Sequence, residues 1–287
     1  MKQYASLAKP GVLFGNVITG VAGFCLASAW LRQFDIVLFV AAIGGMTLII
    51  ASACTLNNVL DQDIDRIMIR TKKRVVASGV VPVRRALAFS IALGILGIVV
   101  LSFWTNWLVV AIGVAGFIVY VWLYGALAKR RSIHGTLVGS ISGAAPILAG
   151  YVAVSGRLDI GALLVFLALF FWQFPEFFSI AIYRESEYKA AGVPVITVKK
   201  SVDYTKRRIF AYAVLFTLSA LLLTSFHYTG YLYAAIMVIV SAYWLFIGFE
   251  GFRPGVDNDR WAKRMFHASL HVLLLYSLLI AIGPLLP

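Results

Sequence analysis

Long apolar stretches separated by short polar segments run the whole length of the chain. Each stretch holds about 20 apolar residues, which as a helix cross a hydrocarbon core of roughly 30 Å. A helix satisfies its own backbone hydrogen bonds in lipid, and the alternating pattern of barrel strands is missing. The pattern predicts nine membrane-spanning helices, at residues 12–30, 36–60, 86–104, 107–124, 137–154, 160–182, 209–226, 231–249 and 266–286.

The composition agrees with this pattern. Apolar residues make up 61% of the 287 residues and charged residues 13%, and the mean hydropathy is +0.91. These values exclude an ordinary soluble domain. We therefore expect an all-α integral membrane protein in which residues 1–287 form one bundle in the lipid bilayer.

Basic residues predict how the bundle is oriented. Of the 25 Lys and Arg residues, all except Arg32 and Arg157 fall in the N-terminal tail or in the loops after even-numbered spans. The positive-inside rule then places these loops and the N-terminus in the cytoplasm, and the C-terminus on the opposite face of the inner membrane. This topology accounts for the net charge of +13, so we expect no nucleic-acid binding.

Three aspartates stand at the end of the second predicted span, where residues 57–66 read NNVLDQDIDR. Carboxylates at a bilayer edge are costly unless a cation neutralises them. Asp61 and Asp65 are four residues apart and share one helical face with Asn57. Oxygen ligands on such a face suit Mg²⁺, which bridges carboxylates to phosphates. The motif therefore predicts a site for Mg²⁺ and a phosphorylated substrate.

Basic side chains close to the aspartates can bind the phosphates. Arg66, Arg70 and Arg74 are spaced by four and would form a stripe beside the aspartates if the helix continued. Lys129 and Arg130 follow the fourth predicted span, in a loop on the same membrane face. Signals of topology and snorkelling anchors are the simpler explanations for such residues. A face with acids and then bases would hold metal ions and the oxygens they bridge.

Small residues lie along one side of the fifth predicted span, at Gly135, Gly139, Gly143 and Gly150. This spacing is typical of close helix packing in membranes, and it can also leave room for a bulky planar ligand. The sequence does not decide between the two.

The acidic motif, together with Arg70 and Arg74, resembles the first aspartate-rich motif of the UbiA-type intramembrane prenyltransferases. Further segments resemble the branch of that family that farnesylates haem, and the likeness covers nearly the whole chain. These segments are KRRS at 129–132, GSISGAAP at 139–146, WQFP at 172–175, AAGVP at 190–194 and RWA at 260–262.

The resemblance implies a bundle of nine helices whose two acidic motifs face each other over a central cavity. Its catalytic cytoplasmic loops would be at about 61–85 and 183–208. Bound Mg²⁺ would hold the diphosphate of farnesyl diphosphate, and the farnesyl group would join a vinyl group of haem B, with water added. The product would serve terminal oxidases, directly or through a haem A synthase.

The resemblance also implies roles for individual residues. Catalysis would depend on Asp61, Asp65, Arg66 and Lys129. The implied diphosphate ligands are Asn57, Arg70, Arg74, Lys129, Arg130, Arg184 and Lys189; the metal ligands are Asn57, Asp61, Asp65 and Glu187; the haem or prenyl contacts are Trp172, Gln173, Glu176 and Tyr188.

Two positions depart from the pattern of the family. Glu187 stands where the second acidic motif commonly has aspartate, and a glutamate would reach Mg²⁺ through a longer arm. Glu176 stands inside the sixth predicted span where histidine is common. It could accept a proton, approach the haem or pair with a base in the cavity, and we favour the pairing. His267 and His271 are four residues apart, so they could bind one metal or flank a haem, and we favour a buried hydrogen-bonded pair.

Other functions compete with haem farnesylation. A prenyltransferase of the same family could use a quinone-type or chlorophyll-like acceptor, although the double asparagine at 57–58 and the segment 139–146 favour haem. A transporter would place its polar residues near the membrane midplane, and often has inverted repeats. The midplane of this chain is nearly free of charge, which favours an enzyme.

Overall fold

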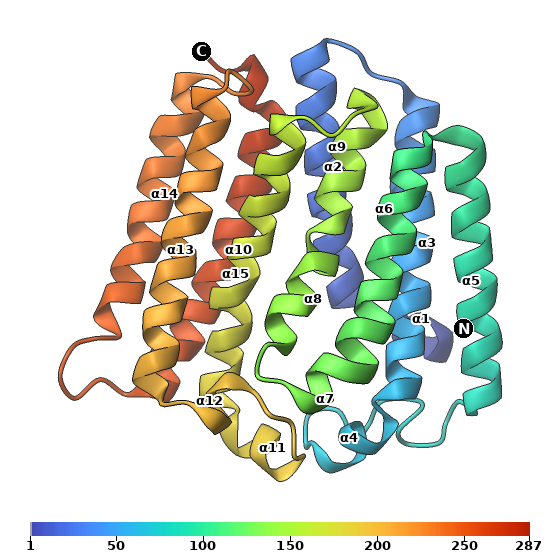
Figure 1. The fold of residues 1–287 in the computed structure, drawn as a ribbon, viewed down its shortest axis with the longest axis vertical. Coiled ribbons are helices and arrows are strands. Elements are labelled where there is room, and N and C mark those ends of the chain that lie inside the picture. The colour runs from blue at the N-terminus through green and yellow to red at the C-terminus, as the bar shows by residue number, and fades with distance from the viewer. Residues whose placement is uncertain (1) are drawn as a thin grey trace.

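The computed structural model describes residues 2–287, and every regular element among them is helical (Figure 1). Within this range nine helical stretches are long and apolar enough to span a membrane, which confirms the predicted number. They are α2 (Pro10–Leu31), α3 (Ile36–Leu60), α5 (Val83–Trp104), α6 with η1 and α7 (Trp107–Ile118, Val119–Ala128 and Lys129–Arg131), α8 with α9 (Gly135–Gly143 and Ala145–Ser155), α10 (Ile160–Tyr183), α13 (Val202–Ser225), α14 (Tyr231–Glu250) and α15 with η2 (Asn258–Ile282 and Gly283–Leu285).

Several spans continue past the ends of their apolar sequence. The fourth stretch runs to Arg131, so Lys129 and Arg130 lie on a helix and not in the predicted loop. The seventh begins earlier than predicted, directly after Ser201, whose hydroxyl accepts a hydrogen bond from Tyr204 N at 3.1 Å. Apolarity marks the part of a helix that lies in lipid, whereas a capping side chain marks where the helix starts.

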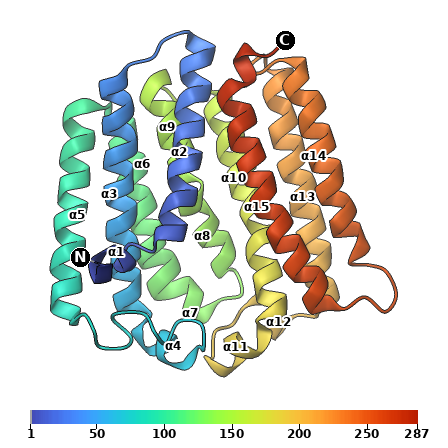
Figure 2. The same cartoon turned by 180° about the vertical axis from the view of Figure 1, so that it is seen from behind.

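The long helices run side by side, and the short helices gather at one end of the bundle (Figures 1 and 2). These short helices are α4 (Gln62–Ile67), α11 (Glu185–Ala190) and α12 (Ile196–Lys199), and we call this end the α4 end. The C-terminus lies at the opposite end. The N-terminal helix α1 (Lys2–Leu7) is held to α3 where Asn58 Nδ2 donates to Leu7 O at 2.8 Å.

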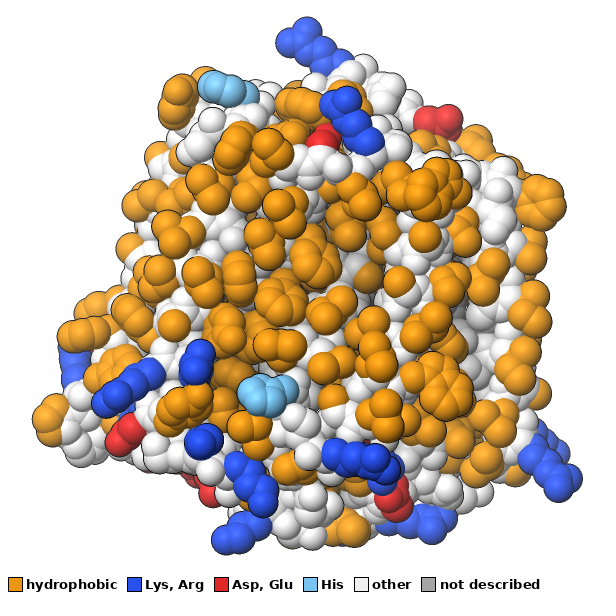
Figure 3. All heavy atoms as spheres, viewed as in Figure 1, with side chains coloured by type: hydrophobic (Ala, Val, Ile, Leu, Met, Phe, Trp, Pro, Cys, Tyr) orange, Lys and Arg blue, Asp and Glu red, His pale blue; other side chains and the backbone are white. Residues whose placement is uncertain are grey.

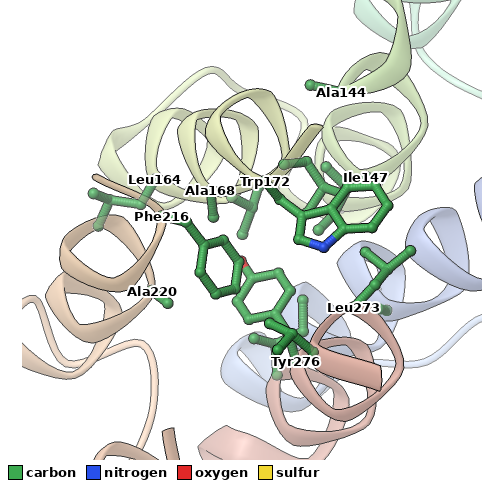
Figure 4. Packing of buried hydrophobic residues seen from close by; sticks show 14 of the residues in the cluster. Ala144, Ile147, Leu164, Ala168, Trp172, Phe216, Ala220, Leu273 and Tyr276 are labelled. Carbon is green, nitrogen blue, oxygen red and sulfur yellow. The ribbon is translucent and has the colours of Figure 1, made fainter. Parts of the chain in front are cut away.

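Apolar side chains cover both the outside and the inside of the bundle. Figure 3 shows them across the middle of one face, with Lys and Arg side chains near the two ends, most of them at the α4 end. Inside, Trp172, Phe216 and Tyr276 from three helices pack together, and the ring centroids of Phe216 and Tyr276 are 5.3 Å apart (Figure 4). A helix that is apolar all round is what a membrane bundle requires.

The two histidines of α15 do not form the expected buried pair. His267 and His271 share one face, as their spacing requires, but both are exposed. His267 Nδ1 lies 2.7 Å from Lys263 O of its own helix. The prediction is wrong because spacing fixes which residues share a face, whereas helix packing decides whether that face points inward.

The glycines of the fifth span divide between the two roles that the sequence left open. A Cβ atom added to Gly150 would lie within 3.0 Å of Gly20 O, so this glycine allows α9 to approach α2 closely. Gly135, Gly139 and Gly143 line a cavity. Gly143 also packs closely, because a Cβ atom there would lie within 3.0 Å of Gln173 Oε1. The pocket-side glycines lie on α8, toward the α4 end, and Gly150 lies on α9.

Candidate active site

The acidic motif lies where α3 ends and α4 begins. Asp61 joins the two helices, and its backbone N–H donates to Asn57 O at 2.9 Å, so the helical path is nearly continuous. Asn57, Asp61 and Asp65 are buried and line one cavity, whereas Asp63 is exposed. The spacing of four therefore puts three oxygen-bearing side chains on one face.

Each buried aspartate is paired with a base from a distant part of the chain. Lys129 Nζ donates to Asp61 Oδ2 at 2.5 Å. Arg74 Nη1 lies 2.8 Å from each of the two carboxylate oxygens of Asp65. These pairs offset the cost of burying two negative charges. They also bring two cations to the acidic end of the cavity.

The acidic face fits a magnesium ion that is bound together with a phosphate. Among residues 2–287 no three His, Cys, Asp or Glu side chains are grouped closely enough to hold a metal by themselves. Asp61 Oδ1, however, is buried without a hydrogen-bond partner, so this oxygen is available to a ligand. Mg²⁺ usually takes one or two carboxylates and completes its shell with water and phosphate oxygens.

Lys9 belongs to this site, although its sequence context suggests only a topology signal. Its ammonium group donates a hydrogen bond to Asn57 Oδ1 and lines the cavity. Burial, and to a smaller extent the charge of Arg74, lowers the pKa of Lys9 to about 8. Lys9 has a left-handed backbone, with φ of 52°, directly before the proline that starts α2. That turn sends its side chain into the bundle.

The arginines after the aspartates do not form the predicted stripe. Helix α4 ends at Ile67, and the next residue is extended, so no helix carries the spacing of four further. Arg66 is exposed outside the cavity lining, and its Nε donates to Ala77 O at 3.1 Å. Arg70 and Arg74 do line the cavity, because the loop folds back over it.

Arg130 is bound to an acid other than those of the cavity. Its guanidinium group makes two hydrogen bonds of 2.7 Å to Asp63 and one of 2.5 Å to Leu60 O. The hydrogen bond from Arg130 lowers the pKa of Asp63 to about 2. Both side chains lie outside the cavity lining, so their pairing fastens η1 and α7 to the start of α4.

The segment directly before Lys129 has an uncommon geometry. η1 is a π-helix of 10 residues, whereas most π-helical segments are single turns, often at functional sites. Its Tyr120 and Tyr124 line the cavity beside the aspartates, with ring centroids 5.8 Å apart. Sequence reasoning missed both residues, because nothing local distinguishes them from aromatic side chains that face lipid.

The cavity has a volume of about 690 Å³ and reaches from the α4 end into the bundle between α2, α3, α6, α8, α10 and α15. This volume lies in the range of roughly 300–1,000 Å³ that small-molecule sites occupy. Most of its wall consists of apolar and aromatic side chains, and glycines from three of the spans interrupt it. The lining glycines are Gly11, Gly15, Gly113, Gly116, Gly135, Gly139 and Gly143.

Helix α10 contributes three of the predicted haem or prenyl contacts. Trp172 Nε1 donates to Ser269 O at 2.8 Å, and Gln173 Nε2 donates to Ser140 O at 3.0 Å, so both side chains are held in place. Glu176 lines the cavity one turn further on. The expectation that Glu176 pairs with a base is wrong, since no Lys or Arg of the described chain forms an ion pair with it.

The second acidic motif folds against the first at the α4 end. Tyr188 packs on a small apolar cluster of Ile64, Met68 and Val193, which joins α11 to α4, and it also lines the cavity. Burial raises the pKa of Tyr188.

Glu187 of the second acidic motif is paired with Arg184. Arg184 Nη1 donates to Glu187 Oε1 at 2.5 Å, and Arg184 lines the cavity while Glu187 does not. Glu187 Oε2 is buried without a hydrogen-bond partner. Lys189 is exposed and outside the lining. The assignment of Glu187 to a metal stays a prediction.

The fold and the cavity define a class of membrane enzyme. Residues 16–270 match the UbiA prenyltransferase family. In structure, the chain is similar to a digeranylgeranylglyceryl phosphate synthase, with a TM-score of 0.82, 20% identity and coverage of 99% of this chain and 98% of that one. A UbiA homologue from Archaeoglobus fulgidus bound to GPP and Mg²⁺ has a TM-score of 0.74 and 14% identity, over 97% and 99% of the two chains. The chain belongs to the UbiA prenyltransferase family and is a prenyltransferase.

More similar sequences narrow the class. The chain is 44% identical to the protoheme IX farnesyltransferase of Protochlamydia amoebophila over 280 residues, which cover 98% of each chain. It is also 44% identical to the protoheme IX farnesyltransferase of Chromohalobacter salexigens, over 98% of this chain and 95% of that one. These relatives confirm the resemblance to the haem-farnesylating branch. They do not support the transporter hypothesis.

Proposed function

We propose that this enzyme transfers the farnesyl group of farnesyl diphosphate to a vinyl group of haem B, with addition of water, to give haem O. Relatives that match nearly the full length support haem as the acceptor. The volume of the cavity, about 690 Å³, supports it too, because a large flat acceptor needs room beside the prenyl chain. The product would serve terminal oxidases or a haem A synthase.

The observation that carries the proposal is the charge pattern at the α4 end of the cavity. Two aspartates lie there among five basic side chains that also line it, and this excess of positive charge suits a diphosphate. The five are Lys9, Arg70, Arg74, Lys129 and Arg184. Arg66, Arg130 and Lys189 are not part of the proposed site, because they lie outside the lining.

We assign Mg²⁺ to Asn57, Asp61 and Asp65. Glu187 stays in the assignment as the ligand of the second motif, since its Oε2 is buried without a partner. When bound, Mg²⁺ would neutralise the phosphate oxygens and so help diphosphate to leave. The two aspartates hold the ligand oxygens in place, and their present partners Lys129 and Arg74 are already beside the phosphate position.

The basic side chains act on the departing diphosphate. Its negative charge grows as the bond to the allylic carbon breaks, so cations there stabilise the transition state more than the bound substrate. Lys129 and Arg74 would turn from the aspartates to the phosphate oxygens. The apolar wall of the cavity excludes water from the farnesyl cation until it has reacted.

We also infer that the α4 end faces the cytoplasm and that the membrane is the inner membrane. The support is the charge distribution, because only Arg32 and Arg157 lie in loops at the other end.

An assay with purified components tests the proposed reaction. Detergent-purified protein is incubated with haem B, farnesyl diphosphate and Mg²⁺, and the haem is analysed by mass spectrometry. We expect a haem that carries one farnesyl group and one added water, and we expect EDTA to abolish it. Farnesylation of a quinone precursor under the same conditions, with haem B unchanged, would contradict haem as the acceptor.

Replacement of Lys9 by methionine is expected to weaken the binding of farnesyl diphosphate by about tenfold, since a buried charge-assisted hydrogen bond contributes roughly 1.5–3 kcal/mol. Binding is measured by calorimetry with Mg²⁺ and without haem. The matched control is Lys72→Met, which removes an exposed lysine of the loop after α4 and should leave affinity unchanged. Equal affinities of the two variants would remove Lys9 from the site.

A further inference from the structure

Glu176 differs from the other two carboxylates that line the cavity. Asp61 and Asp65 are each paired with a base, whereas Glu176 forms no ion pair and no side-chain hydrogen bond with any described residue. It lies inside the membrane-spanning helix α10, where an acid without a partner is costly. Packing does not account for a carboxylate at this position, because an apolar side chain would fill the wall at a lower cost.

The neighbours of Glu176 cannot take over its chemistry. The only polar group of the Trp172 side chain is its indole N–H, which donates a hydrogen bond to Ser269 O. Gln173 donates to Ser140 O and to Leu169 O, at 3.0 and 2.9 Å. Both side chains are therefore occupied in holding α10 against adjacent helices.

The next residues of this wall, Phe177 and Phe178, are apolar, as are the nearby lining residues of α15, Phe266, Leu270 and Leu273. Glu176 is thus the group of this wall that can accept a proton. Asp61 and Asp65 are unsuited to that task, because each is paired with a base, Lys129 or Arg74, and would hold the metal.

We propose that Glu176 is the general base that accepts the proton of the added water. This inference rests on the proposed farnesyl transfer to haem. The bond between farnesyl C1 and the diphosphate oxygen breaks, and diphosphate leaves with the electron pair. The vinyl π electrons form the new C–C bond, which leaves a cation on the vinyl carbon attached to the porphyrin. Water adds to this carbon, and its proton passes to the Glu176 carboxylate.

In its ionised form Glu176 would serve the same step in a second way. It would stabilise a cation on the vinyl carbon and orient the water by accepting its hydrogen bond. Without Glu176 the released diphosphate takes a proton from the carbon adjacent to the cation, and the product is a farnesylated haem that lacks the added water.

The test compares product identities, which a purely structural role would not change. Wild type, Glu176→Gln and Glu176→Asp are incubated with haem B, farnesyl diphosphate and Mg²⁺ in ¹⁸O-water, and both the haem products and the released diphosphate are measured. The matched control is Glu185→Gln, which removes a carboxylate outside the cavity lining. Binding of farnesyl diphosphate to each variant shows that the donor site is intact.

We expect the ¹⁸O-labelled product to fall about 10²-fold or more in Glu176→Gln, in line with the contribution of a general base. The farnesylated haem lighter by one water should replace it, while Glu185→Gln and Glu176→Asp keep the labelled product. Labelled product at the wild-type rate from Glu176→Gln, or its loss from Glu176→Asp as well, would overturn the inference.

The product of the wild-type enzyme shows whether the proposed water addition fails or only the proposed role of Glu176. A farnesylated product without ¹⁸O from the wild type would overturn both the water addition and the role of Glu176. Labelled wild-type product with an unaltered product from Glu176→Gln would overturn the role of Glu176 alone.

Discussion

Replacing Asp61 by asparagine is expected to lower turnover by about 10²- to 10³-fold, as removal of a preorganised charge at the reacting centre does. The change keeps the shape of the side chain but removes the charge that we propose binds Mg²⁺ and that pairs with Lys129, whose Nζ lies 2.5 Å from Asp61 Oδ2. The measurement is the rate of farnesylated haem formation over a range of Mg²⁺ concentrations. Turnover and Mg²⁺ dependence like those of the wild type would contradict the assignment.

Asp63 provides the matched control, two residues further on, in the first turn of α4. Its side chain is 64% exposed and bound to Arg130, outside the cavity. An exposed ion pair contributes at most about 1 kcal/mol, so Asp63→Asn should change turnover by less than about fivefold.

A second variant shows whether Asp61→Asn lowers turnover through catalysis or through unfolding. Asp61→Asn leaves the ammonium group of Lys129 poorly compensated, with 19% of the side chain exposed. The double variant Asp61→Asn with Lys129→Gln removes both charges and should recover stability without recovering turnover. Recovery of turnover would show that Asp61 serves only to neutralise Lys129.

Replacing Gly150 by alanine is expected to destabilise the bundle by about 3 kcal/mol, at the upper end for overpacking. The new Cβ would lie within 3.0 Å of Gly20 O, a backbone atom of α2 that cannot turn aside as a flexible side chain can. A shift of α2 would also disturb Lys9 at its start. The measurement is the thermal unfolding midpoint of the protein purified in detergent.

Gly44→Ala is the control for this change. Gly44 also lies within a membrane-spanning helix, but a Cβ there meets no atom within 4 Å. We expect its midpoint to stay at or slightly above that of the wild type, since alanine is the better helix former. A Gly150→Ala midpoint equal to that of Gly44→Ala would mean that α2 and α9 can separate at little cost.

The sequence did not predict correctly which basic residues line the cavity. Position along the chain predicts that five basic residues share one diphosphate site. These residues are Arg66, Arg70, Arg74, Lys129 and Arg130. Arg70, Arg74 and Lys129 line the cavity, whereas Arg66 and Arg130 lie outside it. Whether a basic residue lines the cavity depends on where α4 ends and on the direction of the loop after it. The spacing of the arginines predicts neither of these.

The sequence by itself determined the class of protein, the number of membrane spans and the face that carries Asn57, Asp61 and Asp65. These follow from hydropathy and helical spacing, which are local properties of the chain. The tertiary structure decided which distant groups meet: Lys9 with Asn57, 48 residues apart, and Lys129 with Asp61, 68 residues apart. It also left Glu176 without a base and turned His267 outward. Such contacts depend on how helices pack against one another, and that packing is a property of the whole bundle.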